Sequence, residues 1–182
     1  MMNNIEVEES KRPTNLEEIE KFEKLIQAKL PKDYKKFLLK HNGGHPITET
    51  FKLIEPVNAK NTEIGVEWFF ALYDGEYSNL TLEFQRTRDE LIDKLVVFLP
   101  IAYDSGGKIC LSIRGDDYGK LYYWTTNWSF WDKDDLDYLY LISNNFTDFI
   151  NGLYRYELDD NDNIIRRYQD GTVTIEPLRK HE

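Results

Sequence analysis

The sequence predicts a single α+β domain in which a mostly antiparallel or mixed sheet is flanked by helices. Three observations favour this fold class. The chain has 182 residues, which suits one domain. Apolar residues recur at helical spacing in three segments, and residues 95–124 contain apolar runs separated by short turns. Aromatic residues make up 14% of the chain and can fill a well-packed core.

The first predicted helix spans about residues 15–28. Thr14 and Glu17 have the spacing of a capping box, in which each side chain bonds a free amide at the helix start. Glutamate and lysine separate the apolar residues that follow, which gives an amphipathic pattern. The apolar face of this helix consists of Leu16, Ile19, Phe22, Leu25 and Ile26.

A second helix is expected to begin at Pro31, whose fixed φ suits the first helical turn. Asp33 favours the same end through the helix dipole. The sequence Asn42-Gly43-Gly44 supplies residues that tolerate positive φ, and it therefore predicts the end of this helix.

The middle of the chain is predicted to combine strands with one surface helix. Residues 51–54 and 68–73 are strand candidates, and residues 80–91 have the mixed spacing and charge of a surface helix. Short glycine-containing turns then separate three apolar runs, which predicts an antiparallel meander. These runs are residues 95–102, 108–113 and 121–124.

The C-terminal part is predicted to contain a helix and a hairpin. Ser143 or Asn144 can cap a helix that presents an apolar face, and Asp170-Gly171 between two apolar runs is a hairpin signal. We therefore divide the chain into three parts. These are a flexible segment over residues 1–13, a domain over residues 14–156, and residues 157–182, which combine an acidic segment with a β-hairpin.

Asp and Glu outnumber Lys and Arg by 33 to 23, which gives a net charge of −10. Phosphates would be repelled, so direct nucleic-acid binding is not expected, whereas a basic protein surface would be attracted. An acidic charge can equally serve solubility alone. The N-terminus lacks a signal-peptide pattern, and no apolar run approaches the roughly 18 residues of a membrane helix. We expect a cytoplasmic protein that contacts no membrane.

Patterns that carry catalysis or metal binding are weak in this sequence. His41 and His45 straddle a helix end and His181 is distant in sequence, so no metal site is expected. Cys110 lies within a predicted strand and is interpreted as a small structural residue rather than a nucleophile. Residues 104–108 contain two glycines but lack the spacing of a phosphate loop. We therefore expect no catalytic residue and no cofactor.

Aromatic and acidic residues crowd residues 118–137. Strand alternation places Tyr122 and Trp124 on one face and Tyr123 on the other. Partly buried Tyr and Trp beside acids can form a hot-spot patch for a basic partner. The same rings can instead pack beneath a long loop. The sequence leaves both interpretations open.

Three blocks of the sequence, taken in order, carry a family resemblance. The first is residues 30–39 (LPKDYKKFLL), followed by residues 42–44. The second is residues 99–107 (LPIAYDSGG), continued by residues 109–113, Gly115, residues 118–119 and residues 122–124. The third is residues 142–150 (ISNNFTDFI) with Leu153. Together, over about residues 14–154, they resemble the SMI1/KNR4 superfamily, also called SUKH.

The resemblance implies an α+β fold with a mixed-order sheet flanked by helices. Bacterial members of the family are typically immunity proteins, which bind and neutralise a toxin domain, often a nuclease, from polymorphic toxin systems. Fungal members are implicated in cell-wall synthesis regulation and signalling. Lys108 departs from the neutral polar residue that commonly follows the glycine pair in the family. Residues 58–79 and the tail after Tyr156 have no matched counterpart.

We expect an immunity protein that binds a cognate, basic toxin domain without catalysing a reaction; a regulatory scaffold that binds a host protein is the alternative. The expected partner-binding residues are Asp104, Lys108, Asp116, Asp117, Tyr118, Trp124 and Trp128. The expected turn-forming glycines are Gly43, Gly44, Gly106, Gly107 and Gly119. Asp104 has a second interpretation, in which its carboxylate caps its own turn.

Overall fold

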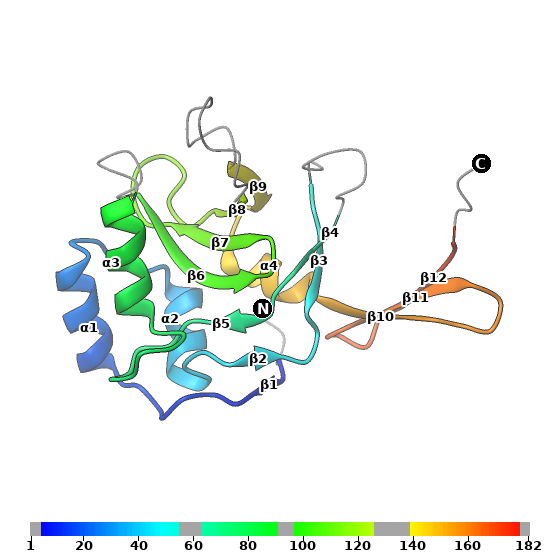
Figure 1. The fold of residues 1–182 in the computed structure, drawn as a ribbon, viewed down its shortest axis with the longest axis horizontal. Coiled ribbons are helices and arrows are strands. Elements are labelled where there is room, and N and C mark those ends of the chain that lie inside the picture. Colours follow the sequence, from blue (N-terminus) through cyan, green and yellow to red (C-terminus); the bar gives the residue numbers. More distant parts are fainter. Residues whose placement is uncertain (1–4, 55–62, 91–96, 126–138, 179–182) are drawn as a thin grey trace.

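The computed structural model describes residues 5–54, 63–90, 97–125 and 139–178 of the chain, with the backbone alone for residues 88–90. This part of the chain has four helices and three sheets, whose strands pair antiparallel (Figure 1). The α+β fold class predicted from the sequence is confirmed. The helices are α1 (Leu16–Leu25), α2 (Lys32–Lys40), α3 (Leu80–Glu90) and α4 (Phe146–Asn151).

Five strands form the central sheet, in the order β5-β6-β7-β8-β9. The predicted meander is the middle of this sheet, because β6, β7 and β8 follow one another and pair antiparallel. The strands of the central sheet are β5 (Trp68–Phe69), β6 (Phe98–Asp104), β7 (Gly107–Ser112), β8 (Leu121–Thr125) and β9 (Leu139–Ser143).

A second five-stranded sheet has the order β12-β11-β10-β3-β4, and a two-stranded sheet joins β1 to β2. The strands of the second sheet are β3 (Thr50–Lys52), β4 (Glu63–Gly65), β10 (Tyr154–Leu158), β11 (Asn163–Tyr168) and β12 (Val173–Pro177). The short sheet consists of β1 (Val7–Glu8) and β2 (His45–Pro46).

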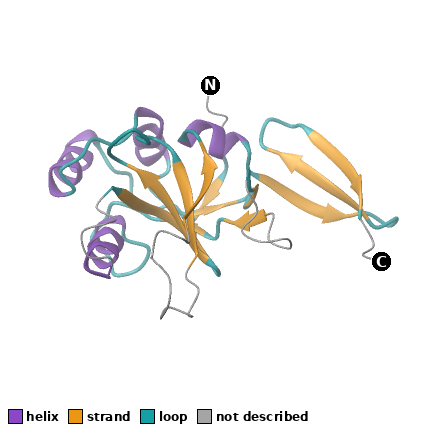
Figure 2. Ribbon diagram, turned by 90° about the horizontal axis from the view of Figure 1, so that it is seen from above, coloured by secondary structure: helices purple, strands orange, loops and turns teal. Residues whose placement is uncertain are grey.

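The first three helices and the last three strands lie at opposite ends of the molecule. Figure 1 shows α1, α2 and α3 together beside the central sheet, with β10, β11 and β12 extending away from the other end. Figure 2 shows from above that these three strands extend away from the rest of the molecule. In the part of the chain that is described, no helix is long and apolar enough to cross a membrane.

An aromatic cluster joins α2, α4 and the central sheet. The ring centroid of Phe37 on α2 lies 5.2 Å from that of Phe146 on α4 and 4.7 Å from that of Phe69 on β5. All three side chains are fully buried, which removes a large apolar area from water. The Asp33 carboxylate fixes the same packing, because it accepts hydrogen bonds from the N–H and the hydroxyl of Thr147 on α4.

The first two helices each begin one residue later than the sequence predicts. Asn15 is the N-cap of α1, because its side-chain oxygen accepts the Glu18 N–H at 3.0 Å. The predicted capping box of Thr14 and Glu17 is therefore wrong, and Thr14 instead donates to the Glu18 carboxylate at 2.7 Å. Pro31 is the N-cap of α2, with an extended ψ of 144°, rather than its first helical residue.

The predicted end of α2 at residues 42–44 is confirmed, and all three residues have positive φ. The buried Asn42 side chain donates to the carbonyls of Arg12 and Leu72 and accepts the Leu72 N–H. This turn therefore ties the N-terminal segment and the chain after β5 to the end of α2.

Several strands lie where the sequence analysis places none. β1 pairs with β2 and Ile5 is buried, although residues 1–13 are expected to be flexible. β9 and β10 are also additions, while β5 spans only the first two of the predicted residues 68–73. The hairpin expected around Asp170-Gly171 is present as β11 and β12, and β10 extends it to three strands.

Candidate functional site

The predicted partner-binding residues separate into two groups at opposite ends of β7. Asp104 and Lys108 flank the β6–β7 turn, whereas residues 116–118 lie in the loop that follows β7. A six-residue strand is about 20 Å long, so the two groups do not form one compact patch. Trp124 pairs with Lys108 and belongs to the first group. Trp128 lies outside the described residues.

The Asp104 carboxylate is held by three hydrogen bonds within the chain. Oδ1 accepts the Tyr123 hydroxyl at 2.8 Å and the Gly106 N–H at 2.9 Å, and Oδ2 accepts the Gly65 N–H at 3.3 Å. Burial and the nearby carboxylate raise the pKa of Tyr123, so its hydroxyl stays protonated as a donor. This geometry favours the interpretation in which Asp104 caps its own turn.

Lys108 lies between an acidic side chain and an aromatic ring. Its Nζ atom is 3.1 Å from Glu83 Oε2 on α3 and 5.6 Å from the centroid of the Trp124 ring. Trp124 is 5% exposed and packs with Cys110, apart from the main core. The ring therefore supports Lys108 from within the protein and offers a partner almost no surface.

A groove of about 720 Å³ opens beside the β6–β7 turn, and we call it the turn groove. Phe70 and Tyr103 contribute stacked rings, with centroids 5.6 Å apart. Tyr77 lines the groove with 80% of its surface exposed. The charged lining includes Glu83, which pairs with Arg86 at 2.8 Å and with Lys108 at 3.1 Å. The turn groove thus combines an apolar wall, an exposed aromatic ring and a fixed charge network.

Tyr77, Glu83 and Arg86 were not predicted as site residues from the sequence. Tyr77 lies in a segment without a matched counterpart, and the other two belong to α3, which is predicted only as a surface helix. Lys108 is a partial signal, because a lysine at the start of a predicted strand needs a nearby acid if it is buried. In the structure its side chain is 19% exposed. The choice of Glu83 as that acid depends on how α3 packs against the central sheet, and local patterns do not reveal this.

The loop at the other end of β7 is anchored to the end of α1. Arg114 Nη2 donates to two carbonyls there, at 2.7 and 3.0 Å. Asp117 pairs with Lys120 at 2.5 Å, and this hydrogen bond lowers the pKa of Asp117. Asp116 and Tyr118 are exposed. This loop therefore carries three of the predicted contact residues at a distance from the turn groove, and two of them are exposed.

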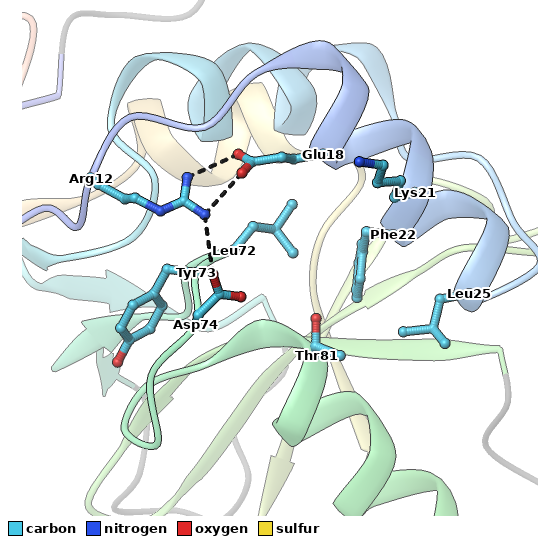
Figure 3. Close-up of a pocket in the computed structure, with 9 residues that line it drawn as sticks. All are labelled: Arg12, Glu18, Lys21, Phe22, Leu25, Leu72, Tyr73, Asp74 and Thr81. Carbon is cyan, nitrogen blue, oxygen red and sulfur yellow. Dashed lines mark hydrogen bonds and ion pairs between the residues drawn. The ribbon is translucent and has the colours of Figure 1, made fainter.

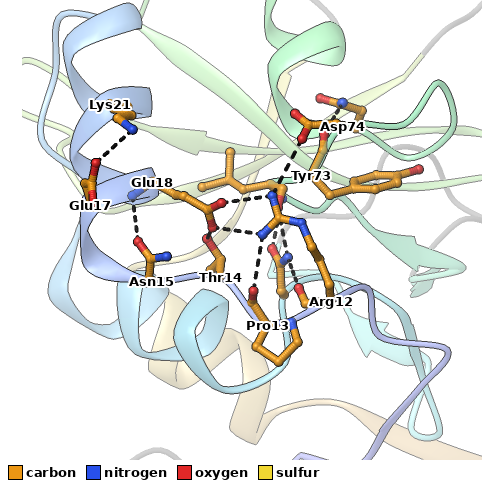
Figure 4. Close-up of polar contacts among 12 residues, drawn as sticks. Arg12, Pro13, Thr14, Asn15, Glu17, Glu18, Lys21, Tyr73 and Asp74 are labelled. Atoms are coloured by element: carbon orange, nitrogen blue, oxygen red, sulfur yellow. Dashed lines mark hydrogen bonds and ion pairs between the residues drawn. The ribbon is translucent and has the colours of Figure 1, made fainter.

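A second hollow, of about 460 Å³, lies between α1 and the chain after β5 (Figure 3). Phe22, Leu25 and Leu72 supply its apolar lining. Arg12 also lines it and pairs with both Glu18 oxygens, at 2.8 and 3.1 Å (Figure 4).

Glu18 acts as a structural anion in this hollow. Hydrogen bonds from Arg12 and Thr14 lower the pKa of Glu18 to about 2. The carboxylate is therefore ionised at neutral pH, far from the pKa that a general acid requires. The paired side chains hold the N-terminal segment against α1.

Residues 13–152 match the model of the SMI1 / KNR4 family (SUKH-1), which covers more than half of the chain. The chain belongs to the SMI1/KNR4 family. The resemblance read from the three sequence blocks is thus confirmed. No curated protein sequence matches the chain. Both ends of β7 and the turn groove fall within the SMI1/KNR4 region, whereas β10, β11 and β12 lie beyond it.

Two of the predicted turn glycines have a clear steric reason in this SMI1/KNR4 domain. Gly44 has a φ of +109°, and a Cβ there would lie 2.5 Å from the Glu8 carbonyl oxygen. Gly107 begins β7 so close to β8 that a Cβ would lie 2.3 Å from the Trp124 carbonyl oxygen. Gly43, Gly106 and Gly119 occupy the same turns or the loop after β7.

Among the described residues of this SMI1/KNR4 chain, no group of three or more His, Cys, Asp and Glu side chains is placed to hold a metal ion. His41 ends α2, and burial lowers its pKa. His45 Nδ1 lies 2.6 Å from the Glu67 carbonyl oxygen. Cys110 is 2% exposed, and burial raises its pKa to about 12, which disfavours the reactive thiolate.

Proposed function

We propose that this SMI1/KNR4 protein is an immunity protein, which binds a cognate toxin domain and neutralises it by protein–protein contact. The family match over residues 13–152 is the observation that carries this proposal. A regulatory scaffold that binds a host protein is the second candidate, because the family resemblance includes that role. The two candidates share a binding surface and differ in the partner.

The acidic charge of the chain favours a basic partner. Its net charge is −10. A nuclease toxin grips phosphates with Lys and Arg, and therefore presents a basic surface to an acidic inhibitor. Electrostatic steering raises the association rate of such a pair and weakens as ionic strength rises. A nuclease domain is the toxin class that this charge fits best.

The turn groove is the surface on which we place the partner. Tyr77 is 80% exposed and the Arg86 side chain 58% exposed, and these two residue types dominate the energetics of many protein interfaces. The ion pair with Glu83 holds Arg86 before binding, which reduces the entropy lost on association. Asp104 and Lys108 shape the turn and the charged wall beside these contacts.

We place no catalytic step in the turn groove. The Asp104 carboxylate is engaged by the Tyr123 hydroxyl and by backbone N–H groups. The Glu83 carboxylate is engaged by Arg86 and Lys108. Asp104 and Glu83 are thus committed to contacts within the chain, whereas Glu76, the third acid of the groove, is exposed to solvent. Neutralisation by contact requires none of the three as a proton carrier.

Mixing the purified protein with toxin domains encoded beside its gene tests the proposal. We expect a stoichiometric complex with one toxin domain and loss of that domain's activity. Tyr77→Ala should weaken this complex, with Tyr118→Ala at the other end of β7 as the matched control. If the protein instead captures a housekeeping protein from a cell extract and affects no toxin, the scaffold is favoured. Neither a complex nor inhibition with any neighbouring toxin domain would reject immunity.

A further inference from the structure

The strands β10, β11 and β12 lie beyond the family match and extend from the body of the molecule (Figures 1 and 2). β12 is the outer strand of its five-stranded sheet, and within the described residues no strand pairs with its outer side. Such an edge presents backbone N–H and C=O groups that another strand can bind.

The hydrogen bonds at the two ends of β12 identify the backbone groups that point outward. The Thr172 carbonyl accepts a hydrogen bond from the last residue of β11, and the Leu178 N–H donates to the residue before β11. Bonded positions alternate along an antiparallel ladder, so Thr174 also faces β11. Val173 and Ile175 therefore direct their N–H and C=O groups away from β11.

The side chains along this edge also favour pairing. Val173 and Ile175 share one face of the strand and are 46% and 63% exposed. β-branched side chains pack well against cross-strand neighbours. Pro177 has no N–H and ends the free edge two residues further along. The edge is therefore short and limited to Val173 and Ile175.

We infer that β12 pairs antiparallel with β12 of a second copy of this chain, about a twofold axis at Thr174. Val173 of each copy then lies opposite Ile175 of the other copy. All outward N–H and C=O groups of these two residues are paired in this arrangement. The five-stranded sheet that contains β12 in one copy then continues into the same sheet of the other copy.

The sequence of β12 is self-complementary in this register. Glu176 lies opposite Thr172 of the second copy, so the acidic side chains do not face each other. Thr174 lies opposite Thr174 of the second copy, so that two small uncharged side chains meet at the axis. Moving the axis by one residue, to Ile175, would place carbonyl groups opposite Pro177, which cannot donate.

Salt distinguishes this dimer from the proposed toxin complex. Each copy carries a net charge of −10, so two copies repel each other at long range and added salt strengthens the dimer. Binding to a basic toxin domain weakens with salt. The dimer does not depend on the immunity function, and the two can succeed or fail separately.

Cysteine substitution tests the register. Opposed residues at a non-hydrogen-bonded position have Cα atoms about 4.5 Å apart, within disulfide range. The native cysteine, Cys110, is 2% exposed and does not compete. Thr174→Cys should therefore form a disulfide-linked dimer under mild oxidation. Ile175→Cys is more exposed but should stay monomeric, because its two copies are offset along the strands. If the Thr174→Cys variant forms the disulfide-linked dimer no faster than the Ile175→Cys variant, the proposal is wrong.

Sedimentation equilibrium of the full chain gives a second test. The wild-type mass should rise toward twice the monomer mass with concentration, and more so at higher salt. Ile175→Lys should remove this association, whereas Tyr156→Lys, at an exposed position on β10, should leave it unchanged. A wild-type chain that is monomeric at every concentration and salt contradicts the proposal. Amide hydrogen exchange of Val173 and Ile175 that slows only after a toxin domain is added also contradicts the proposal, because the toxin domain then occupies the edge.

Discussion

The Tyr123 hydroxyl on β8 donates a 2.8 Å hydrogen bond to Asp104 Oδ1 at the end of β6. The bond crosses β7, so one phenol holds the turn that borders the turn groove. Because of this bond, Asp104, which was predicted from the sequence as a partner contact, instead stabilises the chain's own turn. The shape of the turn groove beside it depends on this pair.

Removing this hydrogen bond should destabilise the fold. Tyr123→Phe leaves the Asp104 carboxylate without its hydroxyl donor, and we expect the free energy of unfolding to fall by about 1–3 kcal/mol, as for other hydrogen bonds to charged groups. Denaturant unfolding measures the change. A Tyr123→Phe protein as stable as wild type would contradict this account of the turn.

Exposed Tyr77 should contribute to toxin binding without contributing to stability. Tyr77→Ala should weaken the toxin complex by about tenfold or more, as expected for an interface hot spot, and leave the unfolding midpoint unchanged. Tyr118→Ala removes a similar ring at the other end of β7 and should have little effect on affinity. Binding titrations of both variants decide between the two ends, and the reverse order of effects would move the partner to the loop after β7.

Buried Glu23 should make stability depend on pH. Burial opposes its charge, but hydrogen bonds from Lys29, the Leu30 N–H and Lys35 outweigh this and lower the pKa of Glu23. A carboxylate with a depressed folded pKa stabilises the protein above its unfolded pKa of about 4.3, and this stabilisation is lost as pH falls through the folded value.

Glu23→Gln should therefore destabilise the protein most at neutral pH, by about 1–3 kcal/mol, and the difference from wild type should shrink below about pH 4. Denaturant unfolding at a series of pH values measures it. Glu17→Gln is the control, because Glu17 forms an exposed pair with Lys21 and should change stability little. If the loss in the free energy of unfolding caused by Glu23→Gln were independent of pH, the charge of Glu23 would not be its cause.

Cys110 should be inert in the folded protein. Burial raises its pKa to about 12 and covers its sulfur, so a thiol reagent at neutral pH should react only after the chain unfolds. The rate of labelling with and without denaturant measures this. Fast labelling of the native protein would mean that the Cys110–Trp124 cluster opens readily.

Local patterns predicted much of the fold but placed its contacts poorly. The end of α2 at residues 42–44 and the antiparallel meander could be predicted because turn residues interrupt clear apolar runs. β10 was not, since residues 154–158 alternate only weakly and all but Tyr154 are exposed. The one-residue error at α1 arose because Thr14 and Asn15 are both good N-caps.

The candidate site was predicted only in part for a similar reason. Successive turns of a meander lie at opposite ends of its strands, so the strand pattern already separates Asp104 from Tyr118. The pairing of Glu83 with Lys108 depends instead on the packing of α3, a contact between distant parts of the chain that no local motif specifies.

Ionic strength should affect the rate at which the protein meets a basic toxin domain. Because the chain carries a net charge of −10, we expect the association rate to fall as salt increases, while the dissociation rate changes less. Stopped-flow binding across a range of salt concentrations measures both rates. An association rate indifferent to salt would remove the acidic surface from the mechanism.

Under the proposed function, this SMI1/KNR4 protein neutralises its toxin by binding rather than by catalysis. The most direct test is a titration of a fixed amount of active toxin domain with the purified protein, followed by its residual activity. The account predicts a linear loss of activity that ends at a fixed stoichiometric ratio and returns when the complex is dissociated. Complete, irreversible inactivation by a small fraction of an equivalent would contradict it, because one molecule would then have acted on many.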